Sequence, residues 1–264
     1  MLIGKVSGIR RYPVKSMGGE ALAFTTITRH GLRGDRAYAL FDPAENRVAS
    51  AKLFDRFPGL LEFSAQYIQG EWPASGLPPV EVRFPHGVVV RTDAKEFLET
   101  LGAWFGKPTA ISAVTDDRLV RPQAGKYAMT DTYFDYAPLH LLTDVAMASL
   151  ARSSPGSLVA LERFRPNLLI DGIASSDYPE NDWTGREVRI GAQVVLNVTD
   201  PCPRCALPTL AQHHLPKDAG LLKHIALNNT IHTPVLQSEQ PCLGAYAFVV
   251  RGGTVAVGDE VRLA

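Results

Sequence analysis

Cysteine is scarce, because the 264-residue sequence contains only Cys202, Cys205 and Cys242. Three cysteines cannot form the disulfide framework of a small secreted protein, and such scarcity is typical of a reducing compartment. The thiols therefore remain available for chemistry or for binding a metal.

The sequence also lacks an excess of charge of either sign, since 27 Lys and Arg residues balance 27 Asp and Glu residues. Without a global field, we expect no binding to nucleic acid or to a charged membrane surface. An anion-binding site has to be built from a local cluster of donors.

Long apolar runs are missing. No stretch approaches eighteen apolar residues, and the start of the chain lacks the apolar core of a signal peptide. We therefore expect a cytoplasmic protein that does not cross a membrane. Repeats and heptads are absent as well, which leaves ordinary globular packing.

Short strands separated by turns dominate the first half of the chain. β-Branched and aromatic residues between Gly- and Pro-bearing turns predict strands at residues 4–12, 21–27 and 37–41. Residues 80–91 are typical of a hairpin hinged at residues 85–87, and residues 42–46 of a turn. The first half is therefore predicted to be a β-meander.

One helix is predicted to close this half. Asp93 is the expected N-cap, since Phe97, Leu101 and Phe105 follow at helical spacing. The polar stretch 113–133 then places the junction between two domains near residue 115. The predicted domains are residues 1–115 and 116–264.

The second half begins with a helix and returns to strands. Thr143 is the expected cap of a helix, and residues 158–164 are expected to continue as another. Glycine pairs predict hairpins at 191–192 and 252–253. Further strands are predicted at residues 167–171, 187–190, 193–199, 245–250 and 254–257. These elements indicate a β-barrel or sandwich with peripheral helices.

The densest chemical pattern is Asp200-Pro201-Cys202-Pro203-Arg204-Cys205, which follows a predicted strand. Prolines stiffen such a loop, and an Arg beside a thiol favours the thiolate, which is the nucleophilic and metal-ligating form. Two buried structural cysteines are an open alternative. So is a zinc site that recruits His213, His214 or Cys242, or a dithiol redox pair.

Three further segments offer anion-binding groups. Lys15 and Ser16 precede a Gly pair and can hold a phosphate, although the spacing is not that of a P-loop. Arg33 and Arg36 flank a turn where Asp35 can orient a guanidinium. Arg165 and Asn167 surround a proline just before a strand. Each segment alone is explained equally well by solvated or structural side chains.

Together, in this order, the four segments resemble the signature set of MOSC-domain proteins. The similarity covers nearly the whole chain and is greatest to YcbX-like bacterial proteins and mitochondrial amidoxime-reducing components. It implies an α+β, β-rich fold in which an N-terminal β-barrel-like domain packs on a MOSC β-barrel domain with peripheral helices.

The resemblance implies a molybdopterin-type molybdenum cofactor between the two domains. Cys205 would be the protein ligand of molybdenum, and Lys15, Ser16 and Arg36 would hold the pterin phosphate. Arg165, Asn167 and Arg204 would complete the pocket. Binding of pyridoxal phosphate is implied only as an association of the family as a whole.

The activity implied is reduction of N-hydroxylated compounds such as amidoximes, hydroxylamines and N-hydroxylated bases. Because the sequence ends at Ala264 without a four-cysteine module, electrons are expected from a separate flavoprotein or iron–sulfur protein. Asp135, Tyr136 and His140 are possible proton donors or substrate contacts, and His140 is equally well a core histidine. The alternative function is that of a carrier of the cofactor or of sulfur.

Overall fold

A computed structural model describes residues 1–52, 56–68, 72–73, 76–114, 133–173 and 176–264. In this part of the chain a sheet closes on itself into a seven-stranded barrel, because its last strand pairs back with its first. In sheet order the barrel strands are β11 (Leu139–Thr143), β12 (Leu168–Gly172), β1 (Leu2–Arg11), β18 (Glu260–Leu263), β13 (Glu187–Ile190), β14 (Val194–Pro203) and β16 (Ser238–Arg251).

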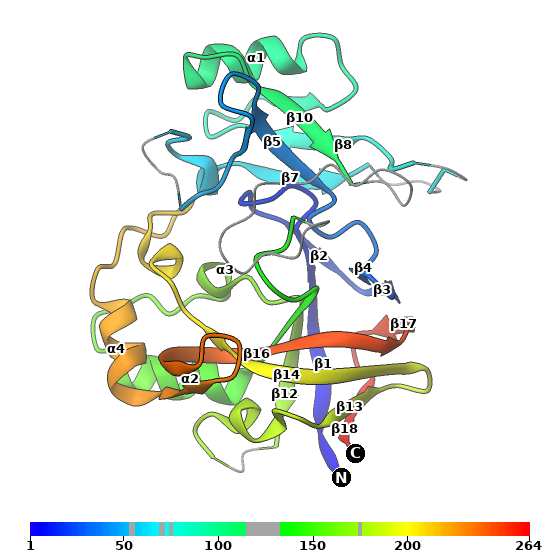
Figure 1. Cartoon of the computed structure of the whole chain (residues 1–264), viewed down its shortest axis with the longest axis vertical. Coiled ribbons are helices and arrows are strands. Elements are labelled where there is room, and N and C mark those ends of the chain that lie inside the picture. Colours follow the sequence, from blue (N-terminus) through cyan, green and yellow to red (C-terminus); the bar gives the residue numbers. More distant parts are fainter. Residues whose placement is uncertain (53–55, 69–71, 74–75, 115–132, 174–175) are drawn as a thin grey trace.

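The barrel draws strands from both ends of the chain. β1 lies between β12 and β18, antiparallel to both, so both termini lie at the same end of the molecule (Figure 1). Buried Val, Ile and Leu side chains that alternate along these strands fill the barrel interior. The predicted α+β, β-rich fold with a barrel and peripheral helices is confirmed.

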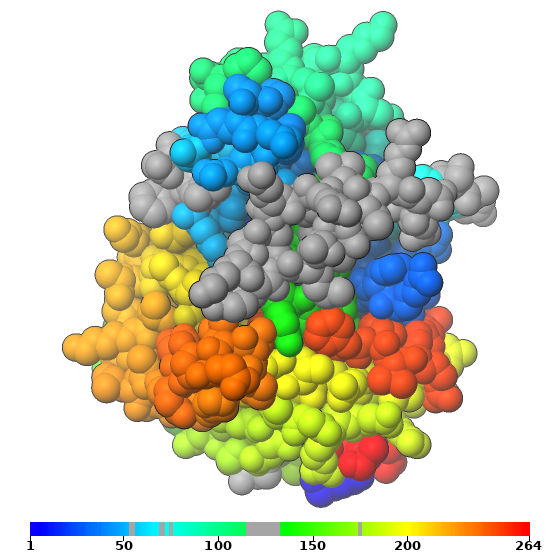
Figure 2. All heavy atoms as spheres, in the orientation of Figure 1, coloured from blue at the N-terminus to red at the C-terminus, as the bar shows by residue number. Residues whose placement is uncertain are grey.

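Three small sheets contain most strands of the first half. They consist of β10 (Ala110–Ala113), β5 (Tyr38–Asp42) and β6 (Arg47–Val48), of β7 (Ser64–Tyr67), β8 (Val80–Arg83) and β9 (Val89–Arg91), and of β17 (Gly253–Ala256), β3 (Phe24–Thr28) and β4 (Gly31–Leu32). Two short strands complete the set: β2 (Glu20–Leu22) pairs with β1 and β15 (Thr230–Thr233) with β16. The space-filling view places the sheets near α1 above the barrel strands (Figure 2).

The helices pack on the outside of the small sheets and of the barrel. α1 (Phe97–Phe105) buries Phe97 and Leu101 in an aromatic-rich core of the first half. α2 (Asp144–Ser153) and α4 (Leu221–Asn228) pack together beside the barrel, and α3 (Leu161–Phe164) precedes β12. Short 3-10 turns lie at Leu60–Glu62, Pro179–Trp183 and Leu207–Thr209.

The helix caps were predicted with mixed success. Thr143 caps α2, since its hydroxyl accepts from the Ala146 N–H at 3.0 Å. The prediction for Asp93 was wrong: α1 begins at Phe97 after Glu96, and the Asp93 carboxylate pairs with Arg91 at 2.7 Å instead. The helix predicted over residues 158–164 is shorter, covering only Leu161–Phe164.

One of the two predicted glycine hairpins was wrong. Gly191 has φ +54° and turns β13 back onto β14, as expected. Residues 252 and 253 make no such turn, and neither has a positive φ. β17 leaves β16 and pairs with β3, because a close approach of Gly252 to the Ile27 carbonyl brings the two segments together. The polar stretch that suggested a junction near residue 115 lies mostly outside the described residues, and the domain boundary stays a prediction.

Candidate active site

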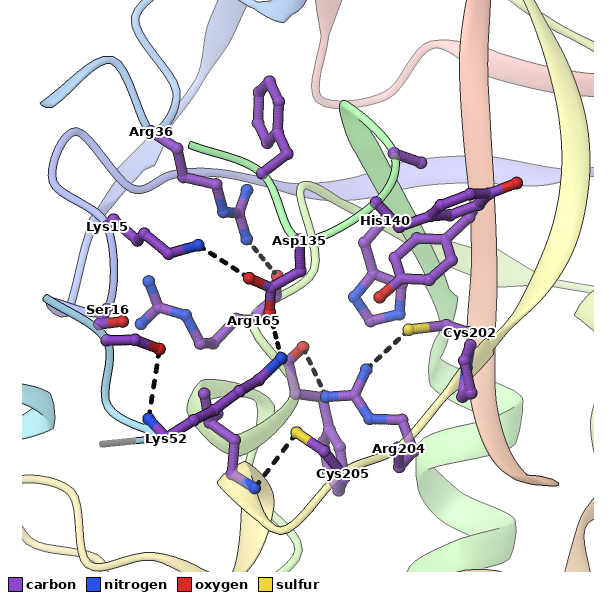
Figure 3. A pocket seen from close by; sticks show the side chains of 18 of the residues that line it. Lys15, Ser16, Arg36, Lys52, Asp135, His140, Arg165, Cys202, Arg204 and Cys205 are labelled. Carbon is purple, nitrogen blue, oxygen red and sulfur yellow. Dashed lines mark hydrogen bonds and ion pairs between the residues drawn. The ribbon is translucent and has the colours of Figure 1, made fainter. Parts of the chain in front are cut away.

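A cavity of about 350 Å³ lies where the barrel meets the loops of the first half. Figure 3 shows Lys15 and Arg36 reaching into it from one side and Cys202, Arg204 and Cys205 from the other. Its lining includes all seven residues that the sequence predicts for the site: Lys15, Ser16, Arg36, Arg165, Asn167, Arg204 and Cys205.

Ends of secondary-structure elements position these side chains. Lys15 and Ser16 follow β1, and Arg36 precedes β5. Arg165 terminates α3, while Arg204 and Cys205 follow β14. Loops held by the barrel therefore place all the predicted side chains around one cavity.

The backbone is unusual at three of these positions. Ser16 (φ 67°), Arg36 (φ 48°) and Arg165 (φ 55°) adopt left-handed conformations that side-chain-bearing residues rarely take. Such a conformation costs on the order of 1–3 kcal/mol and persists only where the surroundings impose it. The concentration of three such residues around one cavity indicates a functional site.

Asn167 uses its side-chain amide to position Arg36 and Asp35. Its Oδ1 accepts from Arg36 Nη1 at 3.3 Å, and its Nδ2 donates to Asp35 Oδ2 at 3.0 Å. Buried Asp35 pairs with Arg36 and also accepts from the Tyr12 N–H at 2.7 Å. The predicted role of Asp35 in orienting a guanidinium is thus seen at Arg36.

Asp135 bridges two lysines at the cavity wall. Its carboxylate oxygens accept from Lys15 Nζ and Lys52 Nζ, each at 2.7 Å. Burial opposes ionisation of Asp135, but the two ammonium groups outweigh it and hold the pKa of this carboxyl well below its usual range. Asp135 is therefore a carboxylate and not a proton donor, while Lys52 is a site residue that sequence reasoning missed.

The two thiols of the cysteine loop differ in exposure. The Cys205 residue is exposed, and its sulfur accepts from the Leu207 N–H at 3.5 Å. Cys202 is buried, and its sulfur lies 2.9 Å from Arg204 Nη1 (Figure 3). Cys205 thus offers a sulfur at the cavity edge, whereas Cys202 orients the guanidinium of Arg204.

Two of the cationic groups retain unused donors. Arg165 Nη2 and Arg204 Nε are buried and have no hydrogen-bond partner among the described residues. Burial lowers the pKa of Arg165 only to about 10, so its guanidinium is charged at neutral pH. Buried charged donors without partners are costly, and an anion in the cavity would satisfy them.

His140 and Tyr136 also line the cavity. Burial, with help from Arg204 and Arg36, lowers the pKa of His140 to about 3, and its Nε2 lies 3.2 Å from the Leu243 carbonyl. Burial and Asp200 raise the pKa of Tyr136 to about 12, and its hydroxyl donates to Asp200 Oδ2 at 2.7 Å. His140 is therefore a neutral core histidine near pH 7, and Tyr136 stays protonated.

Other candidates from the sequence lie away from this cavity. Arg33 stacks over Trp72 at 4.5 Å instead of joining Arg36. His213 and His214 do not line the cavity, and neither does Cys242. Within the described ranges no group of three or more His, Cys, Asp and Glu side chains could hold a metal ion, so the zinc alternative has no ligand set there.

The described residues form a β-barrel protein in which a closed barrel borders a cavity lined by cationic side chains and an exposed thiol. The chain belongs to the MOSC domain family: the MOSC domain matches residues 129–262 and the MOSC N-terminal beta barrel domain matches residues 3–85. The resemblance drawn from the four sequence segments is thereby confirmed.

Curated relatives include two mitochondrial proteins. Mitochondrial amidoxime reducing component 2 of Rattus norvegicus is 23% identical, with 98% of this chain and 83% of that protein aligned. Mitochondrial amidoxime-reducing component 1 of Homo sapiens is 26% identical, with 99% and 83% aligned. Among solved structures, the YUAD protein from Bacillus subtilis aligns with a TM-score of 0.45 and 12% identity, covering 99% of this chain and 95% of that one. In the described residues we find no helix of the length and apolarity that crossing a membrane requires.

Proposed function

We propose that this protein is a molybdenum-cofactor-dependent reductase of N-hydroxylated compounds. One observation carries the proposal: the predicted cations and the predicted thiol, which lie up to 190 residues apart, line a single cavity of about 350 Å³. The similarity to amidoxime-reducing components supports the same reading.

The cationic side of the cavity fits a phosphate-bearing cofactor. Lys15 Nζ uses two of its three N–H groups, on the Tyr133 carbonyl and Asp135, and keeps one. The Ser16 hydroxyl accepts from the Ala51 N–H at 3.0 Å, so its own hydrogen remains available. Arg36 adds a guanidinium fixed by Asp35. These three residues would hold the phosphate.

The remaining residues would hold the body of the cofactor. Arg165 and Arg204 offer the unpartnered donors described above. Arg36 links the other two residues, since its Nη1 donates to Asn167 Oδ1 and its Nη2 to the Arg165 carbonyl, each at 3.3 Å. The Cys205 thiolate is a soft ligand suited to molybdenum that dithiolene sulfur already binds.

The cofactor would supply the two-electron chemistry that removes oxygen from nitrogen. The balanced reaction converts an N-hydroxyl group, two electrons and two protons to an N–H group and water. The rings of Tyr136 and Tyr246, whose centroids lie 5.4 Å apart, also line the cavity and can orient a planar substrate. The exposed position of Cys205 leaves room for a separate electron-donor protein to approach.

A carrier of cofactor or sulfur is the second candidate. The exposed Cys205 thiol favours it, because a persulfide carrier needs an accessible sulfur and no electron donor. Reduction of an N-hydroxylated compound distinguishes the two candidates, because a carrier needs no such activity.

The test uses protein made in a host that synthesises the molybdenum cofactor. Benzamidoxime is supplied with a reduced viologen dye as electron donor, and formation of benzamidine is measured. The wild type should turn over, Cys205→Ala should lose at least about 100-fold in rate, and Cys242→Ala, a buried cysteine outside the cavity, should remain active. Molybdenum-loaded wild type that reduces no N-hydroxylated compound would favour the carrier.

A further inference from the structure

A second, smaller cavity of about 130 Å³ shares Arg165 with the main cavity and is also bordered by Tyr12. Its polar lining comes from Arg10, Ser64, Glu162, Arg165, Gln212 and His213. Arg165 borders both cavities, whereas Gln212 borders only the small one.

Gln212 is buried without using its side-chain amide. The residue is 3% exposed, and its Nε2 has no hydrogen-bond partner among the described residues. Arg165, 8% exposed, has the same deficit at Nη2. A buried donor without a partner is costly, so Gln212 Nε2, which borders only the small cavity, indicates a missing acceptor there, while Arg165 borders both cavities.

Close backbone packing shapes the cavity. A Cβ atom on Gly18 would lie 2.7 Å from His213 Nε2 and 3.2 Å from the Phe63 carbonyl, so the absence of a side chain at Gly18 lets the imidazole lie close to the loop that follows β1. His213 itself adopts a left-handed conformation with φ 48°. A strained residue held against a glycine is typical of a built site rather than of a packing defect.

The charge at the cavity favours an anion. Among the described residues that line it, one carboxylate is present: Glu162 pairs with Arg10 at 3.5 Å and offsets one positive charge. Arg165 then remains as an uncompensated guanidinium at this wall, and Gln212, Ser64 and His213 can add neutral donors. The space equals that of about four water molecules, which admits a tetrahedral oxyanion but not a nucleotide.

We propose that the small cavity is a binding site for a free inorganic oxyanion of the size of phosphate or sulfate, held by Arg165, Gln212, Ser64 and Arg10. The site shares Arg165 with the main cavity, but its own donors, above all Gln212, do not depend on the proposed reductase function. Because Arg165 forms a wall of both cavities, occupancy of one site changes affinity at the other, and the coupling is reciprocal.

The test measures binding of inorganic phosphate to full-length, cofactor-free protein by calorimetry at fixed ionic strength. Lys15→Met weakens phosphate binding in the main cavity, and Gln212 borders only the small one, so the part of the remaining binding that depends on Gln212 reports the small cavity. Adding Gln212→Leu to Lys15→Met should weaken that binding by about tenfold or more. Gln66→Leu, the same change on an exposed strand position, should leave it unchanged.

Two results would overturn the proposal. One is that Lys15→Met abolishes all phosphate binding, and the other is that Gln212→Leu leaves the residual binding intact. Glycerol phosphate tests whether the ligand is a free ion or a phosphate ester. If glycerol phosphate binds as tightly as inorganic phosphate, the proposal of a site for a free ion is contradicted. Crystals of wild type soaked in selenate give a readout independent of variant folding. Anomalous density within hydrogen-bond distance of Gln212 Nε2 is expected, and its absence contradicts the site.

Discussion

His140 lies at the wall of the main cavity but belongs to the barrel core. Its ring packs against Gly244, where a Cβ atom would come within 2.3 Å of Nε2, and its backbone N–H donates to Asn167 Oδ1 at 3.2 Å. Gly244 has φ 79° and no side chain, so β16 can bend around the imidazole. The neutral ring is therefore part of the structure that supports Asn167.

His140 should make stability depend on pH. Its pKa is about 3 in the folded protein and about 6.5 in the unfolded chain, so the unfolded chain binds more protons between these values. The stabilisation is present above pH 6.5 and is lost as the pH falls towards 3. Between pH 7.5 and 5.5 the wild type should lose about 1.4 kcal/mol more unfolding free energy than His140→Gln.

Urea denaturation of cofactor-free protein at the two pH values measures this difference. His214→Gln, a change at an exposed histidine, should keep the pH dependence of the wild type. Equal pH dependence in the wild type and His140→Gln would contradict the account, because it would show that folding does not lower the pKa of His140.

At the scale of elements, α3 holds the loop that carries Cys205. The Arg163 side chain is fully buried and donates to four carbonyls, those of Leu158 (2.9 Å), Pro208 (2.9 Å), Leu210 (3.2 Å) and Pro216 (2.7 Å). Three of these carbonyls follow Cys205 in the chain. One guanidinium thus fixes the thiol loop to the helix that ends in Arg165.

Removal of this guanidinium should loosen the loop. Arg163→Met leaves the four carbonyls without their donor and should lower the free energy of unfolding by about 2–4 kcal/mol. Hydrogen exchange should accelerate at residues 207–216 and stay slow in β13. Arg189→Met, on an exposed position of β13, should cost less than about 0.5 kcal/mol. Unchanged exchange in the loop would contradict the account.

Elements were predictable where local patterns decide them. Residues 187–190 alternate buried and exposed before Gly191, and the predicted strand matches β13 at both ends. β16 extends far beyond the predicted residues 245–250, because Pro241 and Gly244 hide the alternation and pairing with β14 and β15 sustains the strand. The extra length of β16 therefore comes from pairing with distant strands, which no local sequence pattern reveals.

The site was predictable through its loops but not through its contacts. Lys15, Arg36 and Arg204 stand out as donors beside turns and prolines. Lys52 does not, because its contact with Asp135 joins positions 83 residues apart and leaves no periodic trace. The engagement of Asn167 with Asp35 spans 132 residues and was invisible for the same reason.

At the scale of the whole molecule, the two halves of the sequence share one barrel and one cavity. β1 pairs with β12 and β18, and Tyr12 donates from its hydroxyl to the Pro166 carbonyl at 3.2 Å. Lys15, Ser16 and Arg36, which we propose hold the phosphate, come from the first half, while the thiol of Cys205 comes from the second. Neither half alone contains the proposed cofactor site.

Molybdenum and pterin content per chain tests this central claim most directly. Wild-type protein from a cofactor-competent host should contain about one molybdenum and one pterin per chain, measured by mass spectrometry of the metal and fluorescence of the oxidised pterin. Cys205→Ala should lose most of the molybdenum, since the metal loses its protein ligand, while the cations of the first half still retain pterin. Wild type without molybdenum, or Cys205→Ala with the full wild-type content, would contradict the account.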